Sequence, residues 1–170
     1  MGGAIDSIPC LTADAIGSAL TRVTTLRRVK ATIELLPPRL YGEAVELWCE
    51  TGLTRPWNDP EADLRKAMTG SASTVLAAVA DDVLLATAMV GHDGHRGWVY
   101  YLAVRPGHQR HGLGRAIMGA CEEWVSARGI AKIQLMVRLG NEPVIAFYQR
   151  LGYIDAEVVV LGRRLDAESP

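Results

Sequence analysis

Cysteine is scarce in this sequence, and its three occurrences lie far apart. Cys10, Cys49 and Cys121 are too few and too widely spaced for a disulfide framework or a zinc cluster. We therefore expect reduced thiols in a cytoplasmic protein, because disulfides persist mainly in oxidising compartments. Cys49 and Cys121 fall on the apolar faces of predicted helices, where a thiol packs as a small hydrophobic group.

The sequence also lacks an excess of charge of either sign. Lys and Arg together number 18 against 19 for Asp and Glu, which gives a formal net charge of −1. A nucleic-acid-binding protein normally has a basic excess or a basic face, and the one basic cluster here is short (Arg22, Arg27, Arg28 and Lys30). No apolar run approaches the ~18 residues that a membrane-spanning helix needs. Neither a nucleic acid nor a membrane is therefore expected as a partner.

Residues 1–28 have no secretory signal pattern, because residues 1–9 contain no basic residue and no apolar segment follows them. A weak helical pattern runs through Leu11, Ile16, Leu20 and Val23. The segment is compatible with a docking helix, a disordered tail or an over-called translation start. We treat residues 1–28 as an N-terminal extension of unknown role and residues 166–170 as a tail.

The 170 residues, of which 49% are hydrophobic, are enough for one domain with a core of its own. Alternating and helical spacings of apolar residues, with Gly and Pro between them, divide residues 29–165 into strands and helices. Strands are predicted over residues 29–36, 74–80, 83–91, 98–104, 132–137 and 153–161, and helices over 40–51, 60–69, 113–128 and 141–150. The order β-α-α-β-β-β-α-β-α-β predicts an α/β fold with a mixed sheet, partly antiparallel and partly parallel.

A glycine-containing loop joins the predicted strand over residues 98–104 to the following helix. Its sequence is Gln109, Arg110, His111, Gly112, Leu113, Gly114 and Arg115. Helix N-termini carry free N–H groups and a partial positive charge, and a glycine allows an anion to approach the backbone closely. The spacing matches neither the dinucleotide fingerprint nor the P-loop, so it indicates either a phosphate site or an ordinary turn between a strand and a helix.

Two motifs together resemble the GNAT superfamily of acyl-CoA-dependent N-acetyltransferases. The loop Gln109–Arg115 is similar to the family's pyrophosphate-binding motif. Asn141, followed by Ala146-Phe147-Tyr148 and Leu151-Gly152-Tyr153, is similar to its second signature. The resemblance covers residues 29–165. It implies a splayed pair of parallel strands that forms the acyl-CoA cleft, with acetyl-CoA as co-substrate.

The resemblance also implies which residues hold the coenzyme. The pantetheine arm would pair with the strand end Leu102-Ala103-Val104, where backbone N–H near Val104 would polarise the thioester carbonyl. Backbone amides across Arg110–Arg115 would hold the pyrophosphate. The side chains of Arg110 and Arg115 either add charge there or are simply solvated.

Tyr148 matches the family's general acid. A tyrosine, whose reference pKa is ~10, is protonated at neutral pH and can donate a proton to the leaving thiolate. By periodicity alone Tyr148 is a core aromatic residue beside Phe147. Asn141 matches a coenzyme contact and is also a good N-cap for its helix. Relatives that acetylate ribosomal-protein N-termini have a Glu base on the preceding strand, and the aligned position here is Met136, so the proton route is open.

Two further segments, residues 53–60 and 93–97, resemble a narrower bacterial subgroup, the YpeA-type acetyltransferases. In the superfamily, the acceptor pocket is usually built by the segment between the first strand and the hairpin. The acceptor-site candidates are therefore Trp57, Asn58, Asp59, Asp93 and His95. Each has a structural alternative, such as an N-cap for Asp59 and a turn for Asp93 and His95.

The expected activity is transfer of an acetyl group from acetyl-CoA to a primary amine, on a small molecule or a peptide, in a ternary complex. The alternative is a catalytically weak acyl-CoA sensor or interaction module with the same fold. A homodimer is plausible by analogy with relatives. No metal is expected, because His92, Asp93, His95 and His108 offer no helical i, i+4 pair and no nearby cysteine.

Overall fold

The computed structural model describes residues 22–26 and 29–165. The chain divides into two compact units, residues 1–136 and 137–170. The first unit contains one six-stranded sheet, and the second contains one helix followed by an extended segment. Weak helical periodicity over residues 11–20 falls outside the described residues.

The sheet of the first unit runs in the order β1-β2-β3-β4-β5-β6. Its four pairings from β1 to β5 are antiparallel, and β5 pairs with β6 in parallel. This confirms the predicted mixed α/β sheet. The strands are β1 Arg22–Leu26, β2 Val29–Leu35, β3 Ser73–Ala80, β4 Val83–His92, β5 Gly97–Val104 and β6 Ile133–Leu135.

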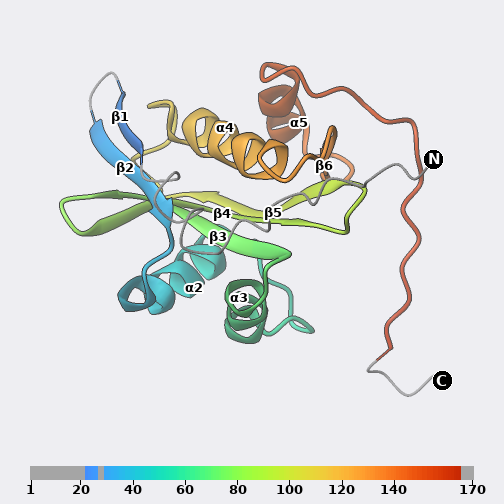
Figure 1. Ribbon diagram of the computed structural model, residues 1–170, viewed down its shortest axis with the longest axis horizontal. Helices are drawn as coiled ribbons and strands as arrows, with labels where there is room; N and C mark the ends of the chain where they lie inside the picture. Colours follow the sequence, from blue (N-terminus) through green and yellow to red (C-terminus); the bar gives the residue numbers. More distant parts are fainter. Residues whose placement is uncertain (1–21, 27–28, 166–170) are drawn as a thin grey trace, which may run out of the picture. The chain divides into compact units, whose positions relative to one another are not determined.

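Helices cover both faces of this sheet (Figure 1). The 3-10 turn η1 Pro38–Leu40 leads into α2 Tyr41–Glu50, and α3 Pro60–Thr69 follows it on the same face. The opposite face is covered by α4 Leu113–Ser126. The central strand β3 is buried along nearly its whole length because it has helices on both sides. The core between α2, α3 and the sheet centres on Trp48, Leu47 and Val75, which are at most 1% exposed.

The strand β1 is a feature that the sequence reading missed. Its residues belong to the segment treated as an N-terminal extension, yet β1 pairs with β2 from Arg22↔Ile33 to Leu26↔Val29. The signal was present in the β-branched run Val23-Thr24-Thr25, which favours a strand over a helix. The weak helical spacing that ends at Val23 overlaps the start of β1, so no strand was predicted there.

The predicted strand over residues 153–161 is wrong. The segment is extended but forms no strand with any described residue. Val159 and Leu161 are 86% and 89% exposed. Their β-branched and apolar composition matches a strand, but a strand also needs a neighbour to accept its backbone hydrogen bonds.

Cys49 is a third correction, because its side chain is exposed, whereas Cys121 is buried as predicted. Cys49 follows the buried pair Leu47 and Trp48 on α2, so the apolar stripe of this helix ends just before it. Burial raises the pKa of the Cys121 thiol well above its ordinary value.

Gly97, at the start of β5, lies directly under α4. A Cβ atom added there would lie 2.6 Å from both γ-carbons of Val125. We expect Gly97→Ala to lower the free energy of unfolding by about 1–3 kcal/mol, because the overpacked contact forces strand or helix to shift. The measurement is urea unfolding followed by circular dichroism.

The Val125→Ala variant provides the control for this contact, because it removes both methyl groups that the new Cβ would meet. The double variant should lose less stability than the sum of the two single changes. Strict additivity, or a Gly97→Ala protein as stable as the wild type, would contradict this account of the packing.

Candidate active site

The parallel pair β5–β6 is joined only at its beginning. Pairing runs from Gly97↔Ile133 to Val99↔Leu135, where β6 ends. β5 continues for five more residues, Tyr100–Val104, without a partner in β6. The sheet therefore has an open backbone edge along the second half of β5.

The backbone of Val104 points to this open edge. Arg105 N–H donates to the Leu85 carbonyl of β4 at 2.8 Å, so Arg105 forms a hydrogen-bonded pair with β4. Adjacent residues in an antiparallel ladder direct their backbone groups to opposite sides. The N–H and carbonyl of Val104 therefore face away from β4, and the Gln109 side chain donates to that carbonyl at 3.3 Å.

The loop between β5 and α4 is anchored at its first residue. Arg105 Nε donates to the Leu84 carbonyl at 2.8 Å, and its guanidinium lies 3.4 Å from the Glu43 carboxylate on α2. Beyond this anchor, the loop turns through Gly107, Arg110 and Gly112, all with positive φ. Arg110 is the unusual member, since an L-residue seldom adopts φ +62°.

The loop connects the end of β5 at Val104 to the N-terminus of α4 at Leu113. Gly112 is the N-cap, with φ +92°, and makes no side-chain cap. The first helical hydrogen bond runs from Ala116 N–H to the Gly112 carbonyl, so the amides of Leu113, Gly114 and Arg115 precede the helical ladder. No acidic residue occupies the first turn. This end of the helix is therefore electropositive.

Two imidazole nitrogens in the same loop are buried without a partner. Within the described part of the chain, Nδ1 of His108 and Nδ1 of His111 have no hydrogen-bond partner. A buried polar atom without a partner is costly to the folded state.

A β-bulge interrupts β5 halfway along its length. Thr87↔Ala103 and Met89↔Tyr100 are successive pairings, so two residues of β5 lie opposite the single β4 residue Ala88. Tyr101 in the bulge has φ +50°, a strained value for a bulky residue. Its carbonyl accepts from the Thr87 hydroxyl at 3.4 Å.

The bulge turns two consecutive tyrosines to the same face. Gly97 faces Val125 of α4, so strand alternation places Tyr100 on the opposite face, toward α3. Tyr101 also lies on that face, where its ring stacks on Trp48 of α2 at 4.2 Å between centroids. Without the extra residue, Tyr101 would point toward α4.

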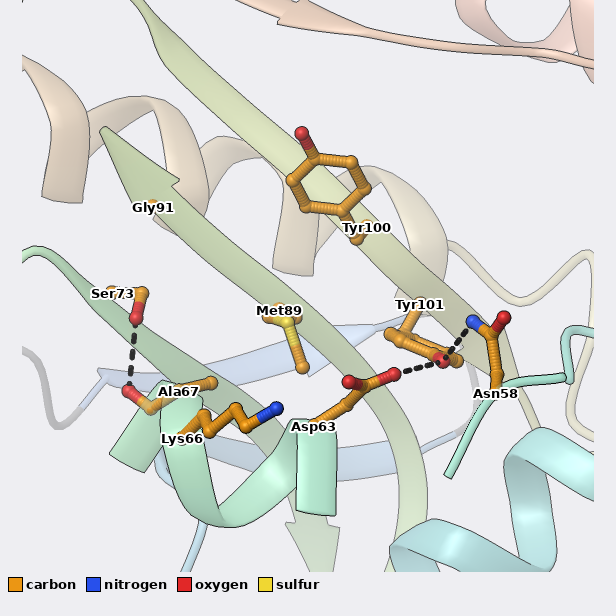
Figure 2. A pocket seen from close by; sticks show the side chains of 9 residues that line it. All are labelled: Asn58, Asp63, Lys66, Ala67, Ser73, Met89, Gly91, Tyr100 and Tyr101. Carbon is orange, nitrogen blue, oxygen red and sulfur yellow. Dashed lines mark hydrogen bonds between the residues drawn. The ribbon is translucent and has the colours of Figure 1, made fainter. Parts of the chain in front are cut away.

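A pocket of about 420 Å³ lies between α3 and strands β3, β4 and β5 (Figure 2). Inside it, the Tyr101 hydroxyl donates to Oδ2 of Asp63 at 2.9 Å and accepts from Nδ2 of Asn58 at 3.3 Å. The lining residues are Asn58, Asp63, Lys66, Ala67, Ser73, Met89, Gly91, Tyr100 and Tyr101.

Of the five acceptor-site candidates, Asn58 alone lines this pocket. Trp57 is 61% exposed on the preceding loop. Asp59 is the N-cap of α3, where its carboxylate accepts from Ala62 N–H at 3.0 Å. Asp93 and His95 form the turn between β4 and β5, and His95 N–H donates to Asp93.

Asp93 is held by three donors in that turn. The strongest effect on its carboxyl is the hydrogen bond from Arg96 N–H, followed by those from His95 N–H and the Trp98 indole, and together they lower its pKa from 3.8 to about 2. Because the folded-state pKa is depressed, the turn is fully stabilised above pH 3.8 and loses that stabilisation as the pH falls toward 2.

Carboxyl carbon NMR of Asp93 should give a titration midpoint near 2, and a midpoint at 3.8 would contradict the three-donor geometry.

The second unit contains the other motif on α5 Glu142–Gln149. Asn141 is the N-cap position, and its carbonyl accepts from Val144 and Ile145 N–H, while its side chain caps no described amide. Tyr148 is 9% exposed. Its ring packs edge-on against Phe147 and Tyr153, with centroids 5.0 and 5.7 Å away.

Sequence reasoning missed most of the pocket. Asp63, Lys66, Met89, Tyr100 and Tyr101 were not among the candidates, although Tyr100 and Tyr101 form an unusual aromatic doublet in a strand. Met136, the position expected from the resemblance to align with the Glu base of ribosomal-protein N-terminal acetyltransferases, is 51% exposed. The described helices include none that is long and apolar enough to cross a membrane.

Solved structures with a similar fold belong to several kinds of protein. The aminoglycoside N-acetyltransferase AAC(6')-Iy in complex with CoA matches with a TM-score of 0.70 and 17% identity, over 84% of this chain and 99% of that one. The 6'-N-acetyltransferase AAC(6')-IG from Acinetobacter haemolyticus matches at 0.64 and 20%, over 79% and 99%. A protein named as a transcriptional regulator from Bacillus halodurans matches at 0.68 and 15%, over 79% and 99%. At these identities the matches establish the fold.

The family follows from a match to the sequence itself. Residues 42–153 match the model of the acetyltransferase (GNAT) family, a span that runs from the second residue of α2 to beyond α5 and includes both motifs. This confirms the superfamily predicted from Gln109–Arg115 and Asn141–Tyr153. The chain belongs to the acetyltransferase (GNAT) family.

Proposed function

We propose that this acetyltransferase moves an acetyl group from acetyl-CoA to a primary amine by direct transfer in a ternary complex. The observation that carries the proposal is the open edge of β5, which ends at a glycine-capped helix N-terminus. An extended arm with an amide backbone fits the strand edge, and a pyrophosphate fits the helix end. The pantetheine arm and the pyrophosphate of CoA combine these two features.

The first unit provides groups for each part of the coenzyme. Leu102, Ala103 and Val104 would pair with the pantetheine arm, and the outward N–H of Val104 would stabilise negative charge on the thioester oxygen during attack. Amides from Arg110 to Arg115 would hold the pyrophosphate, with positive charge from the α4 N-terminus. Gln109 would act on the strand rather than the phosphate, since its side chain fixes the Val104 carbonyl.

The loop residues fit an anion by their chemistry. Gly112, the N-cap of α4, has a positive φ. Successive backbone amides after such a turn can point toward one anion.

Tyr148 would donate the proton that the departing thiolate needs, since a tyrosine is protonated at neutral pH. Asn141 would contact the coenzyme from the start of α5. The amine would enter the pocket beside α3, which Asn58 and Tyr101 line. Trp57, Asp59, Asp93 and His95 have structural roles or exposed positions and are weaker candidates for acceptor contacts.

The test is calorimetric titration with acetyl-CoA, followed by mass spectrometry of an amine panel. The panel should contain an aminoglycoside, because matched structures carry that name, together with polyamines and peptides. Mass spectrometry is preferable to thiol reagents because exposed Cys49 would react with them. Saturable binding with an acetylated product supports the enzyme. Binding without any product favours the acyl-CoA sensor, and no binding at millimolar coenzyme rejects both.

The YpeA-type subgroup, proposed from residues 53–60 and 93–97, concerns only the acceptor side. It would be supported if loop changes in residues 53–60 altered the Michaelis constant for the amine and left coenzyme affinity unchanged.

A further inference from the structure

One carboxylate, that of Asp63 on α3, borders the pocket beside the sheet (Figure 2). Its Oδ2 accepts from the Tyr101 hydroxyl at 2.9 Å. Within the described residues, Oδ1 has no donor or cation against it. One oxygen of this carboxylate is therefore fixed by the protein, and the other is left for a ligand.

Tyr101 is itself firmly held, so it fixes the direction of the carboxylate. Its ring stacks on Trp48 at 4.2 Å, and its hydroxyl also accepts from Asn58 at 3.3 Å. Burial is the main effect and raises the pKa of Tyr101. The hydrogen bond from Asn58 lowers this pKa and the one to Asp63 raises it, with a net upward shift. The hydroxyl therefore stays protonated and continues to donate.

The remaining pocket walls determine what Asp63 can bind. Lys66 on α3 is exposed and makes no ion pair within the described part of the chain. Tyr100 on β5 and Cys49 on α2, the other titratable groups beside this cluster, are not cationic. Met89 and Ala67 contribute apolar surface. Lys66 is the one cation in the pocket lining, and its exposed ammonium can remain in solvent. The anchored anion and the aromatic and apolar parts of the wall then fit an ammonium group on an apolar stem.

Resting on the function proposed above, we propose that Asp63 binds the ammonium of the acceptor amine and takes its first proton, with Tyr101 as the positioning residue. This supplies the base that is absent at Met136. The ammonium N–H bond breaks and an O–H bond forms at Asp63, which leaves a neutral amine. The amine nitrogen then bonds to the acetyl carbon and the carbon–sulfur bond breaks. The leaving thiolate takes one proton from the general acid. The second nitrogen proton passes through water to that acid and restores it, and Asp63 releases its proton to water.

The experiment compares two probe amines of similar shape in wild type and variants. Benzylamine is a cation at pH 7, whereas aniline is neutral. Asp63→Asn removes the charge and keeps an oxygen for Tyr101. It should lower kcat/KM for benzylamine by about 100-fold, as for loss of a general base. The effect on aniline should stay within about threefold, because a neutral amine has no charge to pair with Asp63 and no ammonium proton to lose before attack. The benzylamine deficit should shrink as the pH rises.

Glu61→Gln is the matched control, because Glu61 is an exposed carboxylate two residues earlier on α3 that pairs with Arg65. It should leave both amines unaffected. Tyr101→Phe keeps the stacking on Trp48 and should give a smaller loss with the same preference for benzylamine.

Calorimetry with benzylamine and CoA makes the test independent of turnover. Weaker binding of benzylamine to Asp63→Asn than to wild type supports the proposal. Equal binding, or an equal loss with both amines, overturns it while acetyl-CoA binding still stands. Absence of acetyl-CoA binding would instead overturn the proposed function.

Discussion

Replacing Tyr148 with phenylalanine is expected to lower kcat by about 10²–10⁴-fold, the range for loss of a general acid. The change removes one hydroxyl and keeps the ring, which is 9% exposed and packs against Phe147 and Tyr153. Fold and coenzyme affinity should therefore be preserved. Steady-state kinetics with acetyl-CoA and the best amine, beside a calorimetric Kd, measure the two effects separately.

Tyr153→Phe is the control for this change, since it removes a hydroxyl from the same aromatic cluster of the second unit. It should leave kcat within about twofold of wild type, as expected for a residue outside the chemistry. If both variants lost turnover equally, the hydroxyls would matter for packing rather than for proton donation. Unchanged turnover in Tyr148→Phe would remove the assigned role.

The strand, loop and helix start proposed to hold the coenzyme were predictable as structure because their determinants are local. A strand, a loop with glycines and a helix start follow one another within residues 98–115, and backbone geometry needs only neighbouring residues. Gly112 at positive φ is a position where glycine has a direct structural reason. The exception is Gln109, whose hydrogen bond to the Val104 carbonyl depends on how the loop folds back.

The pocket beside α3 was not predictable in the same way. From the sequence alone, Asp63 is an ordinary acidic residue in the first turn of α3, where its negative charge is favourable beside the positive end of the helix dipole. It becomes a pocket residue only because a β-bulge turns Tyr101 toward it from a strand 38 positions later. The local sequence does not predict the bulge, because tyrosine is equally favourable in a regular strand at positions 100 and 101.

Pairing partners explain the two errors in the strands. β1 and the segment at residues 153–161 have similar β-branched compositions, yet the first lies beside β2 and the second is exposed. Propensity describes which residues tolerate an extended backbone, whereas a strand is defined by the neighbour that shares its hydrogen bonds. A neighbour distant in sequence cannot be read from the segment alone.

Gly112→Val is expected to weaken acetyl-CoA binding by at least tenfold. Gly112 is the N-cap of α4 with φ +92°, and left-handed backbone costs an L-residue roughly 1–2 kcal/mol, more for a β-branched side chain. The loop must relieve that strain by rotating the amides of Leu113 and Gly114 away from the helix end. Calorimetry gives the Kd, and thermal unfolding shows whether the helix itself survives.

Gly119→Ala separates loss of the loop from a general effect of substitution in α4. Gly119 lies inside the same helix, and a Cβ added there meets no atom within 4 Å. The variant should bind acetyl-CoA like wild type and gain up to about 1 kcal/mol of stability, because alanine favours a helix more than glycine does. If Gly112→Val bound coenzyme normally while remaining folded, the α4 N-terminus would not be the phosphate site, and the open edge of β5 would have to provide the affinity without it.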